Sequence, residues 1–305
     1  MSDPTAAYHV PVLLDAIRSR AAGTRRAVDA TVGDGGHAAA LLALGAEVLG
    51  IDRDPTALER ARQRLGESRI RYLESPYAAP AALDAVAGFA PDFILLDLGV
   101  SSRQLDEDSR GFSFRPGAPL DMRMGGGTSA AALLATADEA ELSRIFSEYG
   151  DERRARRLAR EVIRRRATEP FATSDDLVNA IRGALGPATG PGDFARLFQA
   201  VRIAVNDELG GLATALPAFR DALVPGWQLA VISYHSGEDR LVKHLFRGWE
   251  GQCVCPPRQP VCTCSPRSYG RAEPRRAVVP DRGEAAANPR ARSAKLRFFR
   301  LHDHA

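Results

Sequence analysis

A glycine-rich stretch, VDATVGDGGH at residues 28–37, contains the residues whose types and spacing point most clearly to ligand chemistry. Thr31 and Val32 favour a strand. Three glycines follow, Gly33, Gly35 and Gly36. Glycine allows a tight turn in which the backbone comes close to a ligand. Residues 38–44 are good helix formers, so we expect His37 at the start of a helix. A strand, a glycine turn and a helix in this order predict a cradle for a nucleoside cofactor.

An acidic residue follows the strand, turn and helix at the end of a second strand. Asp52 ends the next apolar run, where such folds place the carboxylate that hydrogen-bonds a ribose. The turn reads G-x-G-G-H and differs from the dinucleotide fingerprint G-x-G-x-x-G, because Ala39 stands in place of the third glycine. A small residue is tolerated there, so NAD stays open as an alternative. S-adenosylmethionine has no phosphates and needs only a backbone turn and an acid, so it is the favoured cofactor.

Further elements must position these residues. A third strand is expected at residues 70–74 and a fourth at 91–100, whose continuous apolar run suits a sheet buried on both faces. Asp97 ends the fourth strand, at the edge where open α/β sheets bind ligands. Tyr77 follows the third strand and is either a stacking partner for adenine or a core aromatic. Later strands are expected at residues 227–235 and 295–301, and helices at 14–19, 55–65 and 238–246.

Strands stop alternating with helices between residues 101 and 205, where only helical patterns occur. These patterns lie at residues 129–135, 139–149, 152–166, 173–184 and 194–205. We therefore expect a helical insertion between two strands of the sheet. Residues 151–166 carry eight arginines against three acids, with an apolar stripe at helical spacing. The arginines on the other faces of this helix either contact RNA phosphates or form a solvated surface.

Composition excludes several classes of protein. The chain has 305 residues with 45% hydrophobic content, which is ordinary for a globular protein. It contains no apolar run near the roughly 18 residues of a membrane span and no secretory signal pattern, so we expect a cytoplasmic protein without a membrane partner. The net charge is only +3, but residues 265–300 hold ten basic residues against three acids. Such a tail suits phosphate binding, although a general bias toward arginine would also produce it.

All four cysteines fall in one short segment, at Cys253, Cys255, Cys262 and Cys264. Four thiolates could hold zinc. The C-x-C spacing is not the usual C-x-x-C, so free thiols are favoured over zinc or a disulfide, and no metal is predicted.

Several phrases of the chain, taken in order, resemble the bacterial 16S rRNA (cytosine-N4)-methyltransferase family of the RsmH or MraW type. Each phrase alone is weakly specific, but the ordered set spans nearly the whole chain. The phrases are HVPVLL at residues 9–14, DATVGDGGH at 29–37, LLDLGVSS at 95–102, RGFSF at 110–114, PLDMRM at 119–124, FQAVRIAVN at 198–206, ISYHSGEDR at 232–240 and NPRARSAKLR at 288–297. The chain departs from the family pattern at residues 192–197 and at Gly237, which puts details of RNA binding in doubt.

The resemblance implies a class I S-adenosylmethionine-dependent methyltransferase, with a Rossmann-like, doubly wound α/β sheet and an inserted all-helical substrate domain. The expected division is residues 1–104 and 206–305 for the methyltransferase domain and 105–205 for the insertion. The implied reaction methylates N4 of a cytidine in the decoding centre (P site) of 16S rRNA. The substrate is either the RNA within the small ribosomal subunit or naked RNA. The sequence also leaves open whether the protein forms a homodimer.

The resemblance also implies roles for individual residues. Those expected to contact S-adenosylmethionine are Gly33, Gly35, Gly36, His37, Asp52, Tyr77, Asp97 and Gln104. The charge pattern of the insertion helix and of the basic tail gives the residues expected to contact RNA, which are Arg156, Arg157, Arg160, Arg290 and Arg292. Phe112 or Phe114 could stack on a base that is splayed out of the RNA, or could pack in the core.

The catalytic requirement is a group that accepts a hydrogen bond and a proton from the amine, because the lone pair of cytosine N4 is delocalised into the ring. Asp97 is the first candidate, with Ser101, Ser102, His235 and Ser236 as alternatives. Asp97 could instead only orient the cofactor. Two rival functions stay open: an NAD-dependent oxidoreductase, and a ribosome-assembly factor that binds RNA without turnover.

Overall fold

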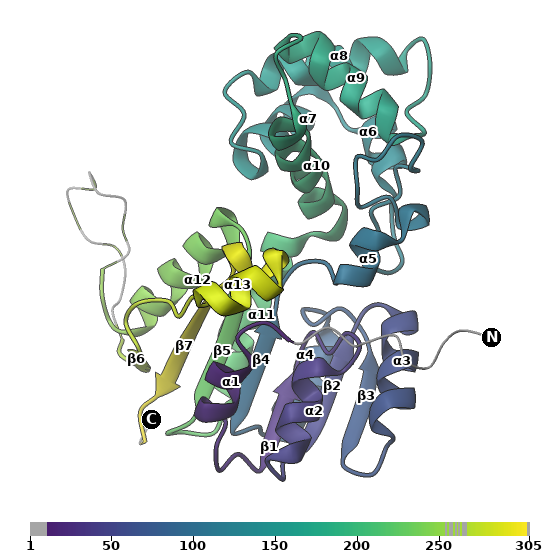
Figure 1. Ribbon diagram of the computed structural model, residues 1–305. Helices are drawn as coiled ribbons and strands as arrows, with labels where there is room; N and C mark the ends of the chain where they lie inside the picture. Colours follow the sequence, from purple (N-terminus) through teal and green to yellow (C-terminus); the bar gives the residue numbers. More distant parts are fainter. Residues whose placement is uncertain are drawn as a thin grey trace. The chain divides into compact units, whose positions relative to one another are not determined.

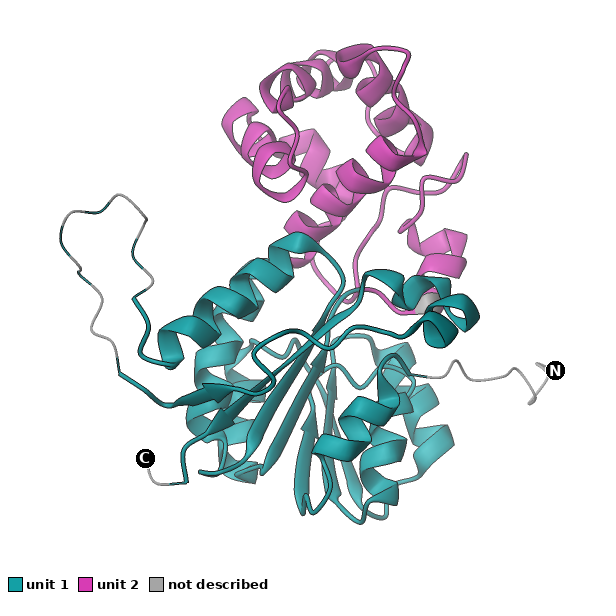
Figure 2. Cartoon of the chain, turned by 60° about the vertical axis from the view of Figure 1, so that its left-hand side comes forward, with its two compact units in different colours: residues 1–99, 209–305 teal, residues 100–208 magenta. Residues whose placement is uncertain are grey.

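The computed structural model describes residues 11–253, 255, 259, 261, 263 and 267–303. The chain forms two compact units. Unit 1 comprises Met1–Gly99 and Leu209–Ala305, and unit 2 comprises Val100–Glu208 (Figure 2). Each unit has its own hydrophobic core.

Unit 1 is built on a seven-stranded sheet with the strand order β3-β2-β1-β4-β5-β7-β6. Strands β1 to β5 run parallel, whereas β7 pairs antiparallel with both β5 and β6. The strands are β1 (Arg26–Asp29), β2 (Glu47–Asp52), β3 (Ile70–Glu74), β4 (Phe93–Asp97), β5 (Gln228–Ser233), β6 (Gly270–Ala272) and β7 (Lys295–Leu301). The predicted doubly wound α/β sheet is confirmed, with an antiparallel edge that the sequence patterns did not indicate.

Helices cover both faces of this sheet (Figure 1). Alternate residues of each strand point to opposite faces, so Ile94 belongs to one buried cluster and Phe93 to the other. One face is packed by α1 (Leu14–Arg20), α2 (Gly36–Ala43) and α3 (Pro55–Leu65), and the other by α4 (Pro80–Phe89), α11 (Glu208–Ala222) and α12 (Ser236–Trp249). A short helix α13 (Arg282–Ala287) and the 3₁₀ turn η3 (Pro289–Ser293) precede β7.

Local sequence explains where several of these elements begin. Helix α3 starts as predicted, because the Asp54 side chain accepts a hydrogen bond from Thr56 N at 3.0 Å and Pro55 fills the first turn. Strand β7 matches the predicted residues 295–301. Helices α4 and α11 and strand β6 were not predicted. In α11, Pro217 lies within the helix and weakens the helical signal, and β6 has only three residues.

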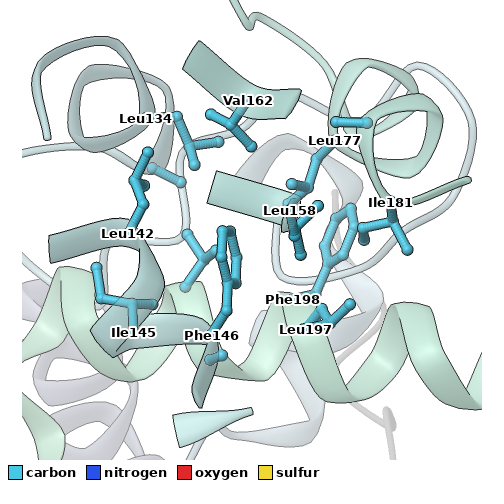
Figure 3. Close-up of a cluster of buried hydrophobic side chains, with 14 of the residues drawn as sticks. Leu134, Leu142, Ile145, Phe146, Leu158, Val162, Leu177, Ile181, Leu197 and Phe198 are labelled. Carbon is cyan, nitrogen blue, oxygen red and sulfur yellow. The ribbon is translucent and has the colours of Figure 1, made fainter. Parts of the chain in front are cut away.

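The regular elements in the described part of unit 2 are all helices. An irregular segment at residues 111–129 separates two of them and forms an isolated bridge, between Pro119 and Thr173. Its elements are α5 (Ser102–Asp106), η1 (Asp108–Arg110), α6 (Ala130–Thr136), α7 (Glu139–Arg144), the π-helix η2 (Ile145–Tyr149), α8 (Ala155–Arg166), α9 (Ser174–Leu185) and α10 (Pro191–Asn206). Figure 3 shows the side chains that fill the core, among them Phe146, Leu158 and Phe198. The predicted apolar stripe of α8 is buried in this core.

Phe112 and Phe114, the two candidates for stacking on RNA, lie in or against the core of unit 2. Phe112 is buried in the core of unit 2, and Phe114 packs edge-on against Phe194 and Phe198 with ring centroids 5.9 and 6.0 Å away. Both rings therefore do core packing, the alternative to stacking on RNA.

Across the part of the chain that the structure describes, no helix combines the length and apolar character needed to cross a membrane.

Candidate active site

The glycine turn joins β1 to α2 at the carboxyl edge of the sheet. Gly35 caps α2 in the left-handed region, with φ of 79°, and a Cβ there would lie 2.7 Å from Leu65 Cδ1. A Cβ on Gly36 would lie 2.7 Å from Pro11 Cγ. Glycine is therefore favoured at position 35 mainly by the positive φ and at position 36 by the close approach of Pro11. At Gly33 the nearest atom to such a Cβ is Thr31 O at 3.9 Å, so this residue leaves free space beside the turn.

Helix α3 holds the turn in place. Arg60 Nε donates to Asp34 Oδ1 at 2.7 Å, and an Arg64 guanidinium nitrogen donates to Asp34 O at 3.2 Å. Both arginines sit one helical turn apart on the same face of α3. The turn is thus fixed before any ligand binds.

Asp52, at the end of β2, braces the same turn. Its Oδ2 accepts a hydrogen bond from Gly33 N, and its Oδ1 accepts one from Asp54 N, both at 2.9 Å. Burial raises the pKa of the Asp52 carboxyl above its ordinary value, and these two backbone bonds oppose the rise. Each carboxylate oxygen has a second lone pair. Asp52 can therefore brace the turn and still accept hydrogen bonds from a ribose, the role predicted for it.

Asp97 ends β4 close to the turn. Its backbone N donates to Thr31 Oγ1 at 2.7 Å, and its Oδ1 accepts a hydrogen bond from Tyr234 Oη at 2.8 Å. Its side chain is 24% exposed. Burial raises the pKa of the Asp97 carboxyl, whereas His37 and the Tyr234 hydroxyl lower it. Burial and the neighbouring Asp97 charge raise the pKa of Tyr234, so this phenol stays a hydrogen-bond donor.

His37 is the second residue of α2, and its ring is 6% exposed. Nε2 lies 3.0 Å from Val12 O, and Nδ1 lies 3.5 Å from Asp97 Oδ2. Both ring nitrogens therefore face groups of the protein. A contact with a cofactor, as predicted for His37, would have to come from its backbone N–H in the first turn of α2.

Asp29, at the end of β1, is a buried acid that sequence reasoning did not single out. It is 1% exposed, and its Oδ1 accepts a weak hydrogen bond from Thr31 N at 3.3 Å. Burial raises the pKa of Asp29 to about 7, with His37 opposing the rise and Asp97 and Asp52 adding to it. The only signal in the sequence is an acid that ends an otherwise apolar strand at the binding edge.

His235 and Glu238 form the N-terminal cap of α12. Glu238 N donates to His235 Nδ1 at 3.4 Å, and Glu238 Oε2 accepts from Tyr234 N at 2.8 Å. His235 Nε2 lies 3.2 Å from Glu238 Oε1 without hydrogen-bond geometry. A Cβ on Gly237 would come within 3.1 Å of His235 Nδ1, so glycine at this position leaves room for the cap. The cap gives His235 a structural role, and its catalytic role stays a prediction.

Ser101 and Gln104 cap each other at the start of α5 in unit 2. Ser101 N donates to Gln104 Oε1 at 2.9 Å, and Gln104 N donates to Ser101 Oγ at 3.2 Å. In unit 1, Tyr77 is half-buried after β3 and packs against the cluster that contains α4 and α11. The roles predicted for these three residues in cofactor binding or catalysis stay predictions.

The predicted RNA-binding arginines of α8 differ in their surroundings. Arg156 Nε and Arg160 Nε both donate to Glu139 Oε1 of α7, at 2.9 and 3.0 Å. The Arg156 bond holds the pKa of Glu139 below its ordinary value, with Arg160 adding to the effect. Arg157 is exposed and has no ion pair with any residue that the structure describes. Arg290 and Arg292 are exposed on η3.

The cysteine segment lies partly outside the described residues. Cys253 is exposed and Cys255 is half-buried. Cys262 and Cys264 are not described, nor is His9 from the first family phrase. The choice between zinc and free thiols therefore stays a prediction.

The edge of the sheet fits a nucleoside cofactor with a carboxylate at one end. No side chain caps the N-terminus of α2, and its first turn contains no acid, so its backbone N–H groups suit a ligand carboxylate. Asp52 presents a carboxylate at the end of β2, on the other side of Gly33, whose free space admits a ligand. This site and the sheet order define the class I S-adenosylmethionine-dependent methyltransferase fold, and S-adenosylmethionine is the cofactor of that fold.

The chain belongs to the MraW methylase family, whose sequence model matches residues 6–302. It is 57% identical over 306 residues to the ribosomal RNA small subunit methyltransferase H of Gemmatimonas aurantiaca, covering 98% of this chain and 97% of that protein. The protein of the same name from Rubrobacter xylanophilus is 49% identical over 302 residues, covering 96% of this chain and 95% of that protein. The predicted family is therefore confirmed, and the oxidoreductase alternative is wrong.

Proposed function

We propose that this protein methylates N4 of a cytidine in the decoding centre (P site) of 16S rRNA, within the small ribosomal subunit. The names of its relatives support small-subunit rRNA as the substrate. The observation that carries the chemistry is the Asp97 carboxylate at the binding edge of the sheet, fixed by the Tyr234 hydroxyl at 2.8 Å. Unit 2 is the proposed substrate-recognition domain.

The proposed cofactor site uses groups on both sides of the glycine turn. Backbone N–H groups of Gly35, Gly36 and His37 would hold the methionine carboxylate at the N-terminus of α2. Asp52 would hold the ribose, while Tyr77 and Gln104 would contribute from the positions that the family resemblance gives them. The bound cofactor supplies an electrophilic methyl group on a sulfonium.

Asp97 is the proposed proton acceptor. Cytosine N4 is a poor nucleophile, and an acceptor that hydrogen-bonds the amine draws its lone pair out of the ring. Oδ1 of Asp97 keeps one lone pair while it accepts from Tyr234. Burial raises the pKa of Asp97, which makes its carboxylate a stronger base than an exposed aspartate. Ser101 and His235 remain the alternative acceptors.

Arginines that have no acidic partner are the better candidates for RNA phosphates. Arg153 and Arg157 are exposed on the arginine-rich segment and have no ion pair with the residues that the structure describes. Arg156 and Arg160 are instead bound to Glu139. A phosphate would have to compete with this carboxylate, so we expect Arg156 and Arg160 to contribute less.

Changing Arg153 and Arg157 to Gln should weaken RNA binding and flatten its salt dependence. Each lost phosphate contact lowers the slope of log K against log salt by about 0.7–0.9. The matched variant Glu139→Gln should do the opposite, because it releases Arg156 and Arg160. Fluorescence anisotropy on an rRNA fragment at several salt concentrations measures both. Equal slopes for the wild type and both variants would show that this helix is only a solvated surface and does not contact RNA.

Labelled methyl transfer to purified small subunits tests the proposed function. The protein is incubated with subunits and S-adenosylmethionine carrying an isotopic methyl group, and the rRNA is digested to nucleosides. We expect the label in N4-methylcytidine. Binding of rRNA without any incorporation would instead support the assembly-factor alternative, and label in another nucleoside would overturn the proposed site of transfer.

A further inference from the structure

The surroundings of the His37 ring determine where its protons lie. Nε2 is 3.0 Å from Val12 O, and a carbonyl can only accept, so Nε2 carries a hydrogen. A neutral ring would then leave a lone pair on Nδ1, directed at Asp97 Oδ2 only 3.5 Å away. Two lone pairs facing each other repel. The contact is favourable only when a proton sits on one of the two groups.

The neighbouring charges favour the proton on His37. Asp97 interacts with the ring. Asp29, at the end of β1, adds its charge when it is ionised, since burial raises the pKa of Asp29 to about 7. The Tyr234 hydroxyl donates to Asp97 Oδ1, a bond that stabilises the carboxylate form. On α12 and α13, Glu238 and Glu284 add negative potential around Asp97 and Tyr234. Among the described groups that shift the pKa of Asp97, His37 is the one that can carry a positive charge.

We propose that His37 is a positioning residue, held as an imidazolium that keeps the Asp97 carboxylate ionised and oriented toward the substrate amine. This role of the side chain rests on the proposed function of Asp97 and is separate from the cofactor contact expected of His37. Val12 O and Asp97 together fix the ring at both nitrogens. In the reaction, the N4 lone pair would form the new bond to the methyl carbon as the bond from that carbon to the sulfonium sulfur breaks, and the electron pair of the broken bond would stay on sulfur. The amine would lose one proton to Asp97, and His37 would keep both of its protons.

The proposal predicts how Asp97 responds when the imidazolium is lost. His37→Gln retains a donor for Val12 O but has no positive charge. Without that charge, the carboxylate of Asp97 becomes harder to form, since a nearby opposite charge favours the ionised state. The acid limb of the kcat–pH profile, measured at saturating cofactor, should therefore move to higher pH by about one unit or more. A purely structural role would lower stability without moving this limb.

Nitrogen NMR of the histidine rings in the protein without cofactor or RNA tests the protonation state directly. The His37 signals are assigned by their loss in His37→Gln. At neutral pH we expect a hydrogen on both ring nitrogens of His37 in the wild type, and on Nε2 alone in Asp97→Asn. If His37→Gln fails to fold, the comparison of the wild type with Asp97→Asn still tests the protonation state of His37. A hydrogen on only one ring nitrogen of His37 in the wild type, or on both in Asp97→Asn, overturns the proposal. Because this experiment uses no substrate, it tests the His37–Asp97 contact independently of the proposed function.

Discussion

Asp97→Asn should lower kcat by about two decades or more, the scale of general acid–base catalysis. The amide keeps the shape of the side chain but has no carboxylate to receive the proton from the amine. Cofactor affinity should fall much less, because the N-terminus of α2 and Asp52 would still hold the ligand. The interaction matters most as the methyl group is transferred, so its loss appears in the transition state. Single-turnover methyl transfer and calorimetric cofactor binding on the same variant separate the two effects.

Asp92→Asn is a matched control for this variant. Asp92 is a buried acid that lies just before β4, at the amino end of the strand, where it accepts hydrogen bonds from Arg25 N and Arg26 N. Its substitution should reduce stability and leave kcat close to that of the wild type. If Asp97→Asn methylates at a near wild-type rate once saturated with cofactor, Asp97 only binds. The proton acceptor would then be Ser101 or His235.

Asp29→Asn should stabilise the protein at neutral and alkaline pH. The pKa of Asp29 rises from 3.8 to about 7 on folding, because the carboxyl is buried. Between these values the unfolded chain releases a proton that the folded protein keeps, so unfolding becomes more favourable as pH rises. The stability contributed by the protonated Asp29 is full below the unfolded pKa and is lost as pH rises through the folded pKa. At about 1.4 kcal/mol for each pKa unit, the loss is on the order of 4 kcal/mol.

Urea unfolding of both proteins across this pH range measures the effect. The amide of the variant keeps an oxygen for Thr31 N and cannot ionise. Its stability relative to the wild type should therefore rise between about pH 4 and 7 and then level off. A difference that does not change with pH would show that Asp29 ionises as readily in the folded protein as in the unfolded chain.

The sheet edge could be predicted from local patterns, whereas the contacts there could not. Asp52 and Asp97 end apolar runs, and the carboxyl ends of neighbouring parallel strands meet at one edge, so sequence alone placed both residues correctly. The environment of His37 depends on Val12 and Asp97, which are 25 and 60 positions away in the chain. No local pattern encodes such a contact. Sequence therefore indicated that His37 belongs to the site but not what its side chain does.

The arginine-rich helix illustrates the same limit in unit 2. Its apolar stripe predicted which face is buried, because helical periodicity is a local property. Which arginines are neutralised depends instead on Glu139 of the preceding helix, 17 residues from Arg156 and 21 from Arg160. The charge of the segment was thus evident from the sequence, and its distribution between paired and unpaired arginines was not.

Mapping of the modified nucleotides in small-subunit rRNA, from cells with and without this protein, tests the central claim most directly. Mass spectrometry of rRNA fragments locates each methyl group. The proposed function predicts that one cytidine of the decoding centre loses its N4-methyl group when the protein is absent and that the wild-type protein restores it, while Asp97→Asn does not. An unchanged set of modifications in cells without the protein, or loss of a methyl group at another position only, would contradict it.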